Sequence, residues 1–436
     1  MAVEPSSTSS YPSRRTRIVC ISDTHNCTIK LPKGDVLIHA GDLTNQGSYS
    51  ELSKTMQWLE KADFEAKIVI AGNHDITLDH EFYSQHWQSF QNQNSKPQDT
   101  ARCLSLLTSS PTITYLRHSS ATIRLDDPKG PRTEFTVFGS PYCPRSGKWA
   151  FGYDCSDLDS AADSPSRVQQ SSYEHAGPKA ADIWADVPAN TDIVVTHTPP
   201  RNHCDALADG RALGCEELRR ALWRVRPRLH VCGHVHHGRG AERVTWEEEE
   251  EEEEDDEKEE ADNPNNGPVR YGEASVEQWE DPSPDAQSGK ICLVDLTSRG
   301  KNWPSHQAAG AGSGAGPGAA RPPAPPGVSC SSTLPQSETE HPTGPIDRTG
   351  RGDDDHPGPS RATSSGLGSH YLGRGGCLGG QAAVPLVDQM GRRRRRQRQE
   401  TCVVNCAVMA TNWPHVGARQ LNKAIVVDLD LPVWRP

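Results

Sequence analysis

Short apolar runs recur along this chain, and five of them end beside Asp, Asn or His residues. The runs are RIVCIS, DVLIHAG, KIVIAG, DIVVT and RLHVCG, and each is rich in β-branched residues. A run this short, followed by Gly, Ser or Thr, is typical of a buried β-strand rather than a helix. The pattern therefore predicts five buried strands, each followed by side chains that can bind a metal ion.

The residues that follow these runs share the ligand chemistry of a metal site: Asp23 and His25, Asp42, Asn73 with His74 and Asp75, His197, and His234 with His236. In open α/β sheets, ligands bind beyond the carboxyl ends of the strands. We therefore expect the five strands to deliver these side chains to one rim. Mixed Asp, His and Asn ligation suits Mn²⁺, Fe or Zn²⁺ better than a thiolate site or a Ca²⁺ site.

The remaining pattern predicts helices outside the strands. Leu52, Met56 and Leu59 lie at helical spacing in the segment 51–62, which indicates a covering helix. Further helical segments are expected over 81–91, 101–108 and 215–224, and further short strands over 112–116, 121–125 and 134–139. Strands that alternate with helices early and accumulate later favour an α/β fold of two packed sheets.

The pattern changes after residue 246. Residues 247–260 hold 13 acidic residues and one Lys, which together equal the chain's net charge of −12. Such a charge block is typical of a solvated linker, and the Gly-, Ser- and Pro-rich residues 301–390 have little to bury.

These shifts in composition predict the domain organisation. We expect a disordered tail over 1–16, a folded domain over 17–246, a low-complexity insertion over 247–400, and strands over 401–434 that complete the domain. KICLVDLT at 290–297 is a candidate strand inside the insertion. It resembles KAIVVDLDL at 423–431, and either could fill the same sheet edge. We also expect that joining Trp246 to Thr401 through a short linker leaves metal binding largely intact.

Several classes of protein are disfavoured by composition. The N-terminus lacks the apolar region of a signal peptide, and no run of 18 apolar residues is present, so no membrane partner is expected. Thirteen Cys residues without a repeating spacing favour a reduced cytoplasmic protein, with the nucleus as the alternative. The basic cluster Arg392–Arg396 has three open interpretations: a nuclear localisation signal, an RNA contact or a partner of the acidic run. The acidic run could also bind basic proteins.

The segments SDTH, GDLT, GNHD, THTPP and GHVH resemble the five motifs of the calcineurin-like metallophosphoesterases. FGSPY (138–142) and VNCAVM (404–409) carry a narrower likeness to a subgroup of small eukaryotic metallophosphoesterase-domain proteins. The resemblance covers about 17–246 and 401–434. It implies a four-layer α/β/β/α sandwich with a dinuclear metal site between the sheets.

The resemblance also implies a role for each motif residue. One metal would be held by Asp23, His25, Asp42 and His236, and the other by Asp42, Asn73, His197 and His234. His74 matches a catalytic histidine that protonates the leaving group or stabilises the charged transition state. Asp75 matches an acid that orients His74.

The implied reaction is hydrolysis of a phosphodiester by attack of a hydroxide that bridges two divalent ions, with Mn²⁺ favoured over Fe and Zn²⁺. The expected partner is a small phosphate ester, such as a cyclic nucleotide. A phosphomonoesterase or protein phosphatase is one alternative. A metal-bearing interaction scaffold, which binds nucleic acid or basic proteins through 247–400, is the other.

Loop position suggests which side chains contact the substrate. Arg201 and His203 follow His197, and His237 follows the pair of His ligands, so all three are candidate substrate contacts. Trp149 and Phe151 could stack on a base, although aromatic residues more often pack in a core.

Overall fold

The computed structural model describes residues 12–90, 96–154, 179–247, 272–281, 288–297, 398–410 and 420–434. The chain divides into two units, and all described residues belong to the unit formed by Met1–Ser305 and Val384–Pro436. The other unit, His306–Ala383, lies outside the described residues, as do the basic cluster Arg392–Arg396 and the acidic run beyond Glu247.

The first sheet has six strands among the described residues, in the order β13-β15-β1-β2-β3-β4. They are β1 (Ser13–Ile21), β2 (Val36–Ala40), β3 (Ala66–Ile70), β4 (Thr114–Tyr115), β13 (Cys292–Asp295) and β15 (Ile425–Pro432). β1, β2 and β3 run parallel, and β2 is buried along its whole length. Parallel strands end at the same edge, so the loops that follow these three strands meet at one rim.

The second sheet has seven strands in the described part of the chain, in the order β12-β11-β14-β10-β9-β6-β5. They are β5 (Ser119–Arg124), β6 (Glu134–Ser140), β9 (Ile193–Thr196), β10 (Leu229–Cys232), β11 (Gly240–Trp246), β12 (Glu273–Gln278) and β14 (Glu400–Asn405). β6, β9, β10 and β14 run parallel, so their following loops also share one rim. β7 (Cys143–Pro144) and β8 (Gly152–Tyr153) form a separate two-stranded pair.

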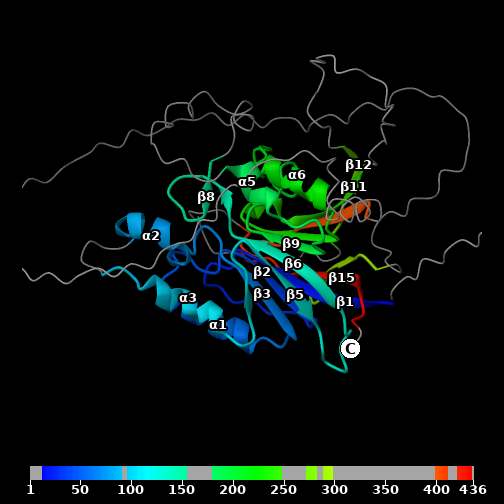
Figure 1. The fold of residues 1–436 in the computed structure, drawn as a ribbon, viewed down its shortest axis with the longest axis horizontal. Coiled ribbons are helices and arrows are strands. Elements are labelled where there is room, and N and C mark those ends of the chain that lie inside the picture. Colours follow the sequence, from blue (N-terminus) through cyan, green and yellow to red (C-terminus); the bar gives the residue numbers. More distant parts are fainter. Residues whose placement is uncertain are drawn as a thin grey trace, which may run out of the picture. The chain divides into compact units, whose positions relative to one another are not determined.

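Helices cover the outer face of each sheet, as Figure 1 shows. One side carries α1 (Tyr49–Lys61), η1 (Ile76–Leu78), α2 (His80–His86), η2 (Trp87–Ser89) and α3 (Thr100–Thr108), and the other carries α5 (Ala180–Ala185) and α6 (Glu216–Val225). Three buried apolar clusters fill the spaces: one between the sheets and one under each helical layer. This four-layer α/β/β/α arrangement confirms the predicted fold class.

Helix α1 shows how local sequence determines where a helix begins and which of its faces is buried. Ser48 and Glu51 form a capping box in which each side chain accepts a hydrogen bond from the other residue's backbone N–H. Leu52, Met56 and Leu59 are buried against the first sheet, as their spacing predicts. The helix begins two residues before the predicted segment, because the cap lies outside the apolar pattern.

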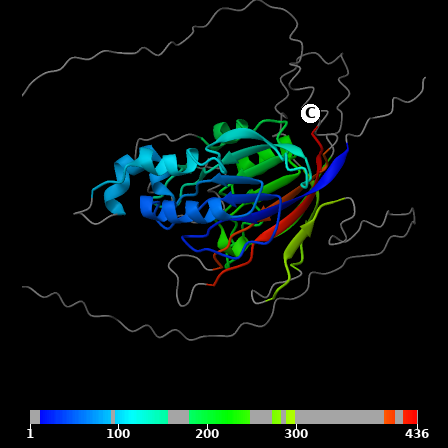
Figure 2. The same ribbon diagram turned by 90° about the horizontal axis from the view of Figure 1, so that it is seen from below.

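The two ends of the described chain pair with each other. β1 begins at Ser13, which pairs with Pro432 of the antiparallel β15, and Figure 2 shows these strands side by side. The disordered tail expected over 1–16 therefore overlaps β1 at residues 13–16. The sequence of 13–16 alone does not reveal this strand, because its backbone partners come from β15.

The segment expected to be an insertion contributes a strand to each sheet. β13 pairs with β15, so both of the similar segments lie in the first sheet, with β13 at its edge. β12, which the apolar pattern does not predict, pairs with β11 at the edge of the second sheet. No helix within the described ranges is both long enough and apolar enough to cross a membrane.

Candidate metal centre

The loops after β1, β2, β3, β9 and β10 bring the predicted ligands together. Their ligand atoms fall into three overlapping groups, each with all atoms within 4.8 Å: Asp23 with His25 and His236, Asp23 with Asp42 and His197, and His25 with Asp42 and His74. Five separate strand ends thus meet at one place, as their position in the sequence predicts.

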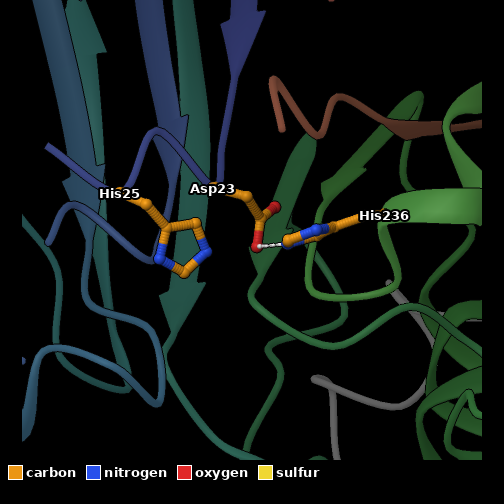
Figure 3. Close-up of side chains that lie close together, drawn as sticks. All are labelled: Asp23, His25 and His236. Carbon is orange, nitrogen blue, oxygen red and sulfur yellow. Dashed lines mark ion pairs between the residues drawn. The ribbon is translucent and has the colours of Figure 1, made fainter. Parts of the chain in front are cut away.

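The first group is built around Asp23. Its carboxylate lies between the rings of His25 and His236, and Oδ1 is 3.3 Å from His236 Nε2 (Figure 3). The backbone N–H of His234 donates to the same carboxylate at 3.0 Å, and the Ser22 hydroxyl also donates to it. Asp23 is fully buried, so these donors hold a carboxylate that water does not reach.

Asp42 lies between the groups. Its Oδ2 faces His25 Nε2 at 3.5 Å, and its Oδ1 faces His197 Nε2 at 3.4 Å. The backbone N–H of His74 donates to Oδ1 at 2.9 Å, which fixes the plane of the carboxylate. Asp42 therefore offers one oxygen to each side, which is the geometry that a shared ligand needs.

The surroundings of His197 fit a cation. Its Nδ1 donates to the carbonyl oxygen of Ala40 at 3.0 Å, so in the neutral tautomer Nε2 carries a lone pair. That lone pair faces Asn73 Oδ1 at 2.9 Å and Asp42 Oδ1 at 3.4 Å. Three acceptor atoms thus converge, and a metal ion bound by all three would satisfy each of them.

The buried Asp and His side chains of the site shift one another's pKa values. Burial disfavours the charged form of His197, but Asp42 outweighs burial and raises its pKa to about 9, so without a metal ion Nε2 carries a proton, which a bound ion would displace. Burial likewise opposes ionisation of Asp42, but His197 and His74 hold its pKa well below the usual range. Burial lowers the pKa of His25 to about 4 and that of His234 to about 3, so both imidazoles are neutral, which is the form that binds metals.

Several ligands have a backbone conformation that is rare for residues with a side chain. Asp23, His25, Asp42 and His234 have φ between 42° and 66°. Gly41, just before Asp42, has φ 93°, and a Cβ there would lie 2.6 Å from His197 Nδ1. Such strain is concentrated at functional sites, where the surrounding structure holds it in place.

His74 lies beside this centre with a defined orientation. Its Nδ1 donates to the carbonyl oxygen of Asn45 at 2.8 Å, which leaves Nε2 as the nitrogen available to other groups. The Trp149 ring packs against the imidazole, with 3.9 Å between ring centroids. The expected contact from Asp75 to the His74 ring is replaced by the Asn45 carbonyl.

Asp75 has a different position from the one the resemblance implies. Its carboxylate is fully buried and accepts hydrogen bonds from the backbone N–H groups of Leu43, Thr44 and Gly72 and from the Thr44 hydroxyl. These contacts join the loop that carries Asp42 to the loop that carries Asn73. Asp75 thus braces the backbone of the site.

A cavity of about 300 Å³ opens over the ligands. Its floor includes His25, Asp42, Asn73, His74, His234 and His236. Its walls include Arg145 and Trp149 from the loop between β7 and β8, and Leu207 and Leu213 from the loop before α6. Arg145 is held by Asp154 at 2.7 Å and by the Gly152 carbonyl at 3.0 Å.

The three predicted substrate contacts do not line this cavity. His203 is 2% exposed, and its ring nitrogens lie 2.9 Å from Glu242 and 3.0 Å from Glu273. Its loop turns toward β11 and β12, so the prediction from loop position was wrong for His203. Arg201 and His237 also lie outside the cavity lining. Arg145 was missed, because only the folded loop brings its guanidinium to the cavity wall.

Comparison with known proteins agrees with this geometry. Residues 16–238 match the model of the calcineurin-like phosphoesterase family, which covers half of the chain. The chain therefore belongs to this family, and the predicted family resemblance is confirmed. The domain is of the class of metal-dependent phosphoric ester hydrolases.

Two relatives show how far the likeness extends. The chain is 37% identical over 238 residues to human metallophosphoesterase domain-containing protein 1, a match that covers 52% of this chain and 63% of that protein. It is 38% identical over 233 residues to a protein of Emericella nidulans named probable rhamnogalacturonate lyase C, covering 53% of this chain and 18% of that protein. The chain thus spans less than two thirds of either relative.

A solved structure is also similar, but only weakly. Purple acid phosphatase PPD1 from yellow lupin seeds aligns with a TM-score of 0.27 and 13% identity, over 55% of this chain and 40% of that chain. A likeness at this level carries no information about substrate.

Proposed function

We propose that this chain is a phosphodiesterase that works with two divalent metal ions, Mn²⁺ being the first to test, and that small phosphodiesters such as cyclic nucleotides are its substrates. The observation that carries the proposal is the position of Asp42. One of its oxygens faces His25 and the other faces His197, so a single carboxylate serves two neighbouring groups of ligands. In the assignment that the family resemblance implies, Asp23, His25, Asp42 and His236 hold one ion, and Asp42, Asn73, His197 and His234 hold the other.

The donor set fits this assignment. The oxygens of Asn73 and Asp42, Nε2 of His197 in its neutral form and the neutral imidazoles of His25 and His234 form a mixed oxygen and nitrogen donor set, which is suited to divalent ions such as Mn²⁺, Fe²⁺ or Zn²⁺. When bound, such ions supply positive charge that polarises a phosphoryl group and acidifies water.

His74 has the proton-transfer role. Hydrolysis joins the oxygen of water to phosphorus and breaks the ester P–O bond, and the leaving oxygen takes a proton. The Nδ1–H of His74 donates to the Asn45 carbonyl oxygen, so a proton on Nε2 is the one delivered to the leaving oxygen. Trp149 packs on the ring and limits its rotation.

The cavity favours a small ester over a protein substrate. A volume of about 300 Å³ is at the lower end of the range for small-molecule sites. Trp149 and Leu213 offer apolar surface for an aromatic substituent, and Arg145, which is also paired with Asp154, adds positive charge to the cavity wall. A phosphodiester carries one anionic phosphate and can place one aromatic substituent against this apolar surface, whereas a phosphorylated protein loop would need a wider opening.

Two variants of the full-length protein test the proposal. The Mn²⁺-loaded protein is assayed with bis(p-nitrophenyl) phosphate, p-nitrophenyl phosphate and a panel of cyclic nucleotides. We expect the diesters to be hydrolysed faster. Asp42→Ala should lose both Mn²⁺ binding and activity, whereas His74→Ala should keep Mn²⁺ binding and lose roughly 10²–10⁴ in kcat.

Other outcomes separate the alternatives. Faster hydrolysis of the monoester would make the protein a phosphomonoesterase. Mn²⁺ binding with wild type and His74→Ala equally slow on every ester would favour the interaction scaffold. In that case we propose, from charge alone, that residues 247–400 contact a basic protein or a nucleic acid. The basic cluster Arg392–Arg396 would then be the proposed nuclear localisation signal.

A further inference from the structure

The buried side chain of Asn405 touches the loop that carries two of the metal ligands. Asn405 ends β14 and is fully buried. Its Nδ2 donates to the carbonyl oxygens of Val235 at 2.8 Å and Cys204 at 2.9 Å, and lies 3.5 Å from that of Gly233. Its Oδ1 accepts from the backbone N–H of Ala407 at 3.2 Å.

These contacts bracket His234. Gly233 and Val235 are its neighbours on either side, so the amide of Asn405 faces the carbonyl oxygens of the residues before and after His234. His234 itself has φ 66°, a conformation that costs free energy unless neighbouring contacts hold it. A primary amide suits this position because it donates two hydrogen bonds and accepts one while remaining neutral.

The residues after Asn405 hold the other side of the centre. The backbone of Ser22 donates to the Cys406 carbonyl at 3.2 Å and accepts from Val408 at 2.9 Å, and Met409 donates to the Asp23 carbonyl at 3.2 Å. The segment 405–409 thus joins the loop after β1 in the first sheet to the loop after β10 in the second. It sets the spacing between Asp23 and the histidines of the second loop.

We propose that Asn405 is a positioning residue for the metal centre, which holds His234 in its ligating conformation although it contacts no metal itself. The inference rests on the proposed function, since it assigns His234 to one of the two ions. Its consequence is selective. Loss of the Asn405 donors should weaken the ion bound by His234 more than the ion held by Asp23, His25 and His236, because His234 has the strained φ of 66°, whereas His236 begins the 3-10 helix His236–Gly238.

The test uses the full-length protein stripped with a chelator and titrated with Mn²⁺. Isothermal titration calorimetry gives the affinity of each ion, and electron paramagnetic resonance reports the coupled Mn²⁺ pair. Asn405→Asp keeps the shape but turns the donor into an acceptor, and Asn405→Ser keeps a single donor. The control, Thr401→Val, lies in the same strand and removes the buried hydrogen bond from Trp246 Nε1.

Wild type should bind two Mn²⁺ ions. We expect Asn405→Asp to weaken one of the two by 10–100-fold and to lose the coupled signal, with Asn405→Ser intermediate and Thr401→Val unchanged. If Asn405→Asp does not fold, the Mn²⁺ affinities of Asn405→Ser decide whether the inference holds.

Three results would overturn the inference: wild-type affinity for both ions in both Asn405 variants, equal weakening of the two ions, or failure of Asn405→Ser to fold. A wild type that binds fewer than two Mn²⁺ ions would instead contradict the proposed function, whatever the variants do.

Discussion

Gly233 shows how closely the two ligand-bearing loops approach at the level of one residue. A Cβ at this position would lie 2.0 Å from Ser22 Oγ and 2.2 Å from Asp23 Oδ2. Distances this short are not tolerated between such atoms, so a side chain would force Asp23 or the His234 loop to move. The glycine of the GHVH motif is therefore required by packing between two sheets.

Replacement of Gly233 by Ala tests this requirement. We expect Gly233→Ala to lower Mn²⁺ affinity by at least tenfold and to destabilise the protein by about 1–3 kcal/mol, the usual effect of overpacking. The matched control is Gly240→Ala, where the nearest atom to an added Cβ is 4.0 Å away. Metal titration and urea denaturation of both variants give the two quantities, and equal behaviour of the variants would contradict the role of Gly233.

Residue types at the site were predictable, but their partners were not. Asp23, Asp42 and His197 follow apolar runs, so their identity and order suffice to place them at one rim. The contacts of Asp75 with Thr44 and the contacts of Asn405 with Val235 depend on which loops meet in three dimensions. No local pattern carries that information.

Strands were predictable wherever both of their faces are buried. β2 and β10 are apolar except for one His each and are buried along their whole length, as expected for parallel strands covered on both sides. β12 has the sequence EASVEQ, with residues that are alternately half-buried and exposed, and its Val276 is 41% exposed. An edge strand of this kind is held by backbone pairing with β11, so it has no apolar run to reveal it.

β12 is also held by a buried charged network, which predicts a pH effect. Burial disfavours the charged form of His203, but Glu242 on β11 and Glu273 on β12 outweigh burial and raise its pKa to about 9. Because the folded pKa lies above the unfolded value, the stabilisation is complete below about pH 6.5 and is lost as pH rises through 9. Its size is on the order of 3 kcal/mol, at about 1.4 kcal/mol per pKa unit.

His203→Gln should remove this pH dependence. We expect the difference in unfolding free energy between wild type and His203→Gln to shrink by about 3 kcal/mol between pH 6 and pH 9.5. Urea denaturation across this range measures it, and the contributions of other titrating groups cancel in the difference. Parallel stability curves for the two proteins would show that His203 is not charged in the folded state.

The fold as a whole is closed by two segments that follow the acidic run. Residues 272–281 and 288–297 supply β12, β13 and Trp279. Trp279 is buried in the core between the sheets, and its Nε1 donates to the Leu293 carbonyl at 3.1 Å. The expectation that Trp246 can be joined directly to Thr401 therefore needs correction, because that deletion removes core residues as well as linker.

Two deletions distinguish linker from core. Residues 298–397 and, separately, 248–397 are replaced by the same Gly/Ser linker of about 20 residues, which spans about 25 Å on average. Loop closure depends only weakly on length, so the shorter deletion should keep Mn²⁺ binding and a near-native Tm. The longer deletion also removes Trp279, whose loss alone, as in Trp279→Ala, should cost about 3–5 kcal/mol. Thermal unfolding and Mn²⁺ titration of the three proteins measure this, and equal stability of the two deletions would place β12, β13 and Trp279 outside the cooperative core.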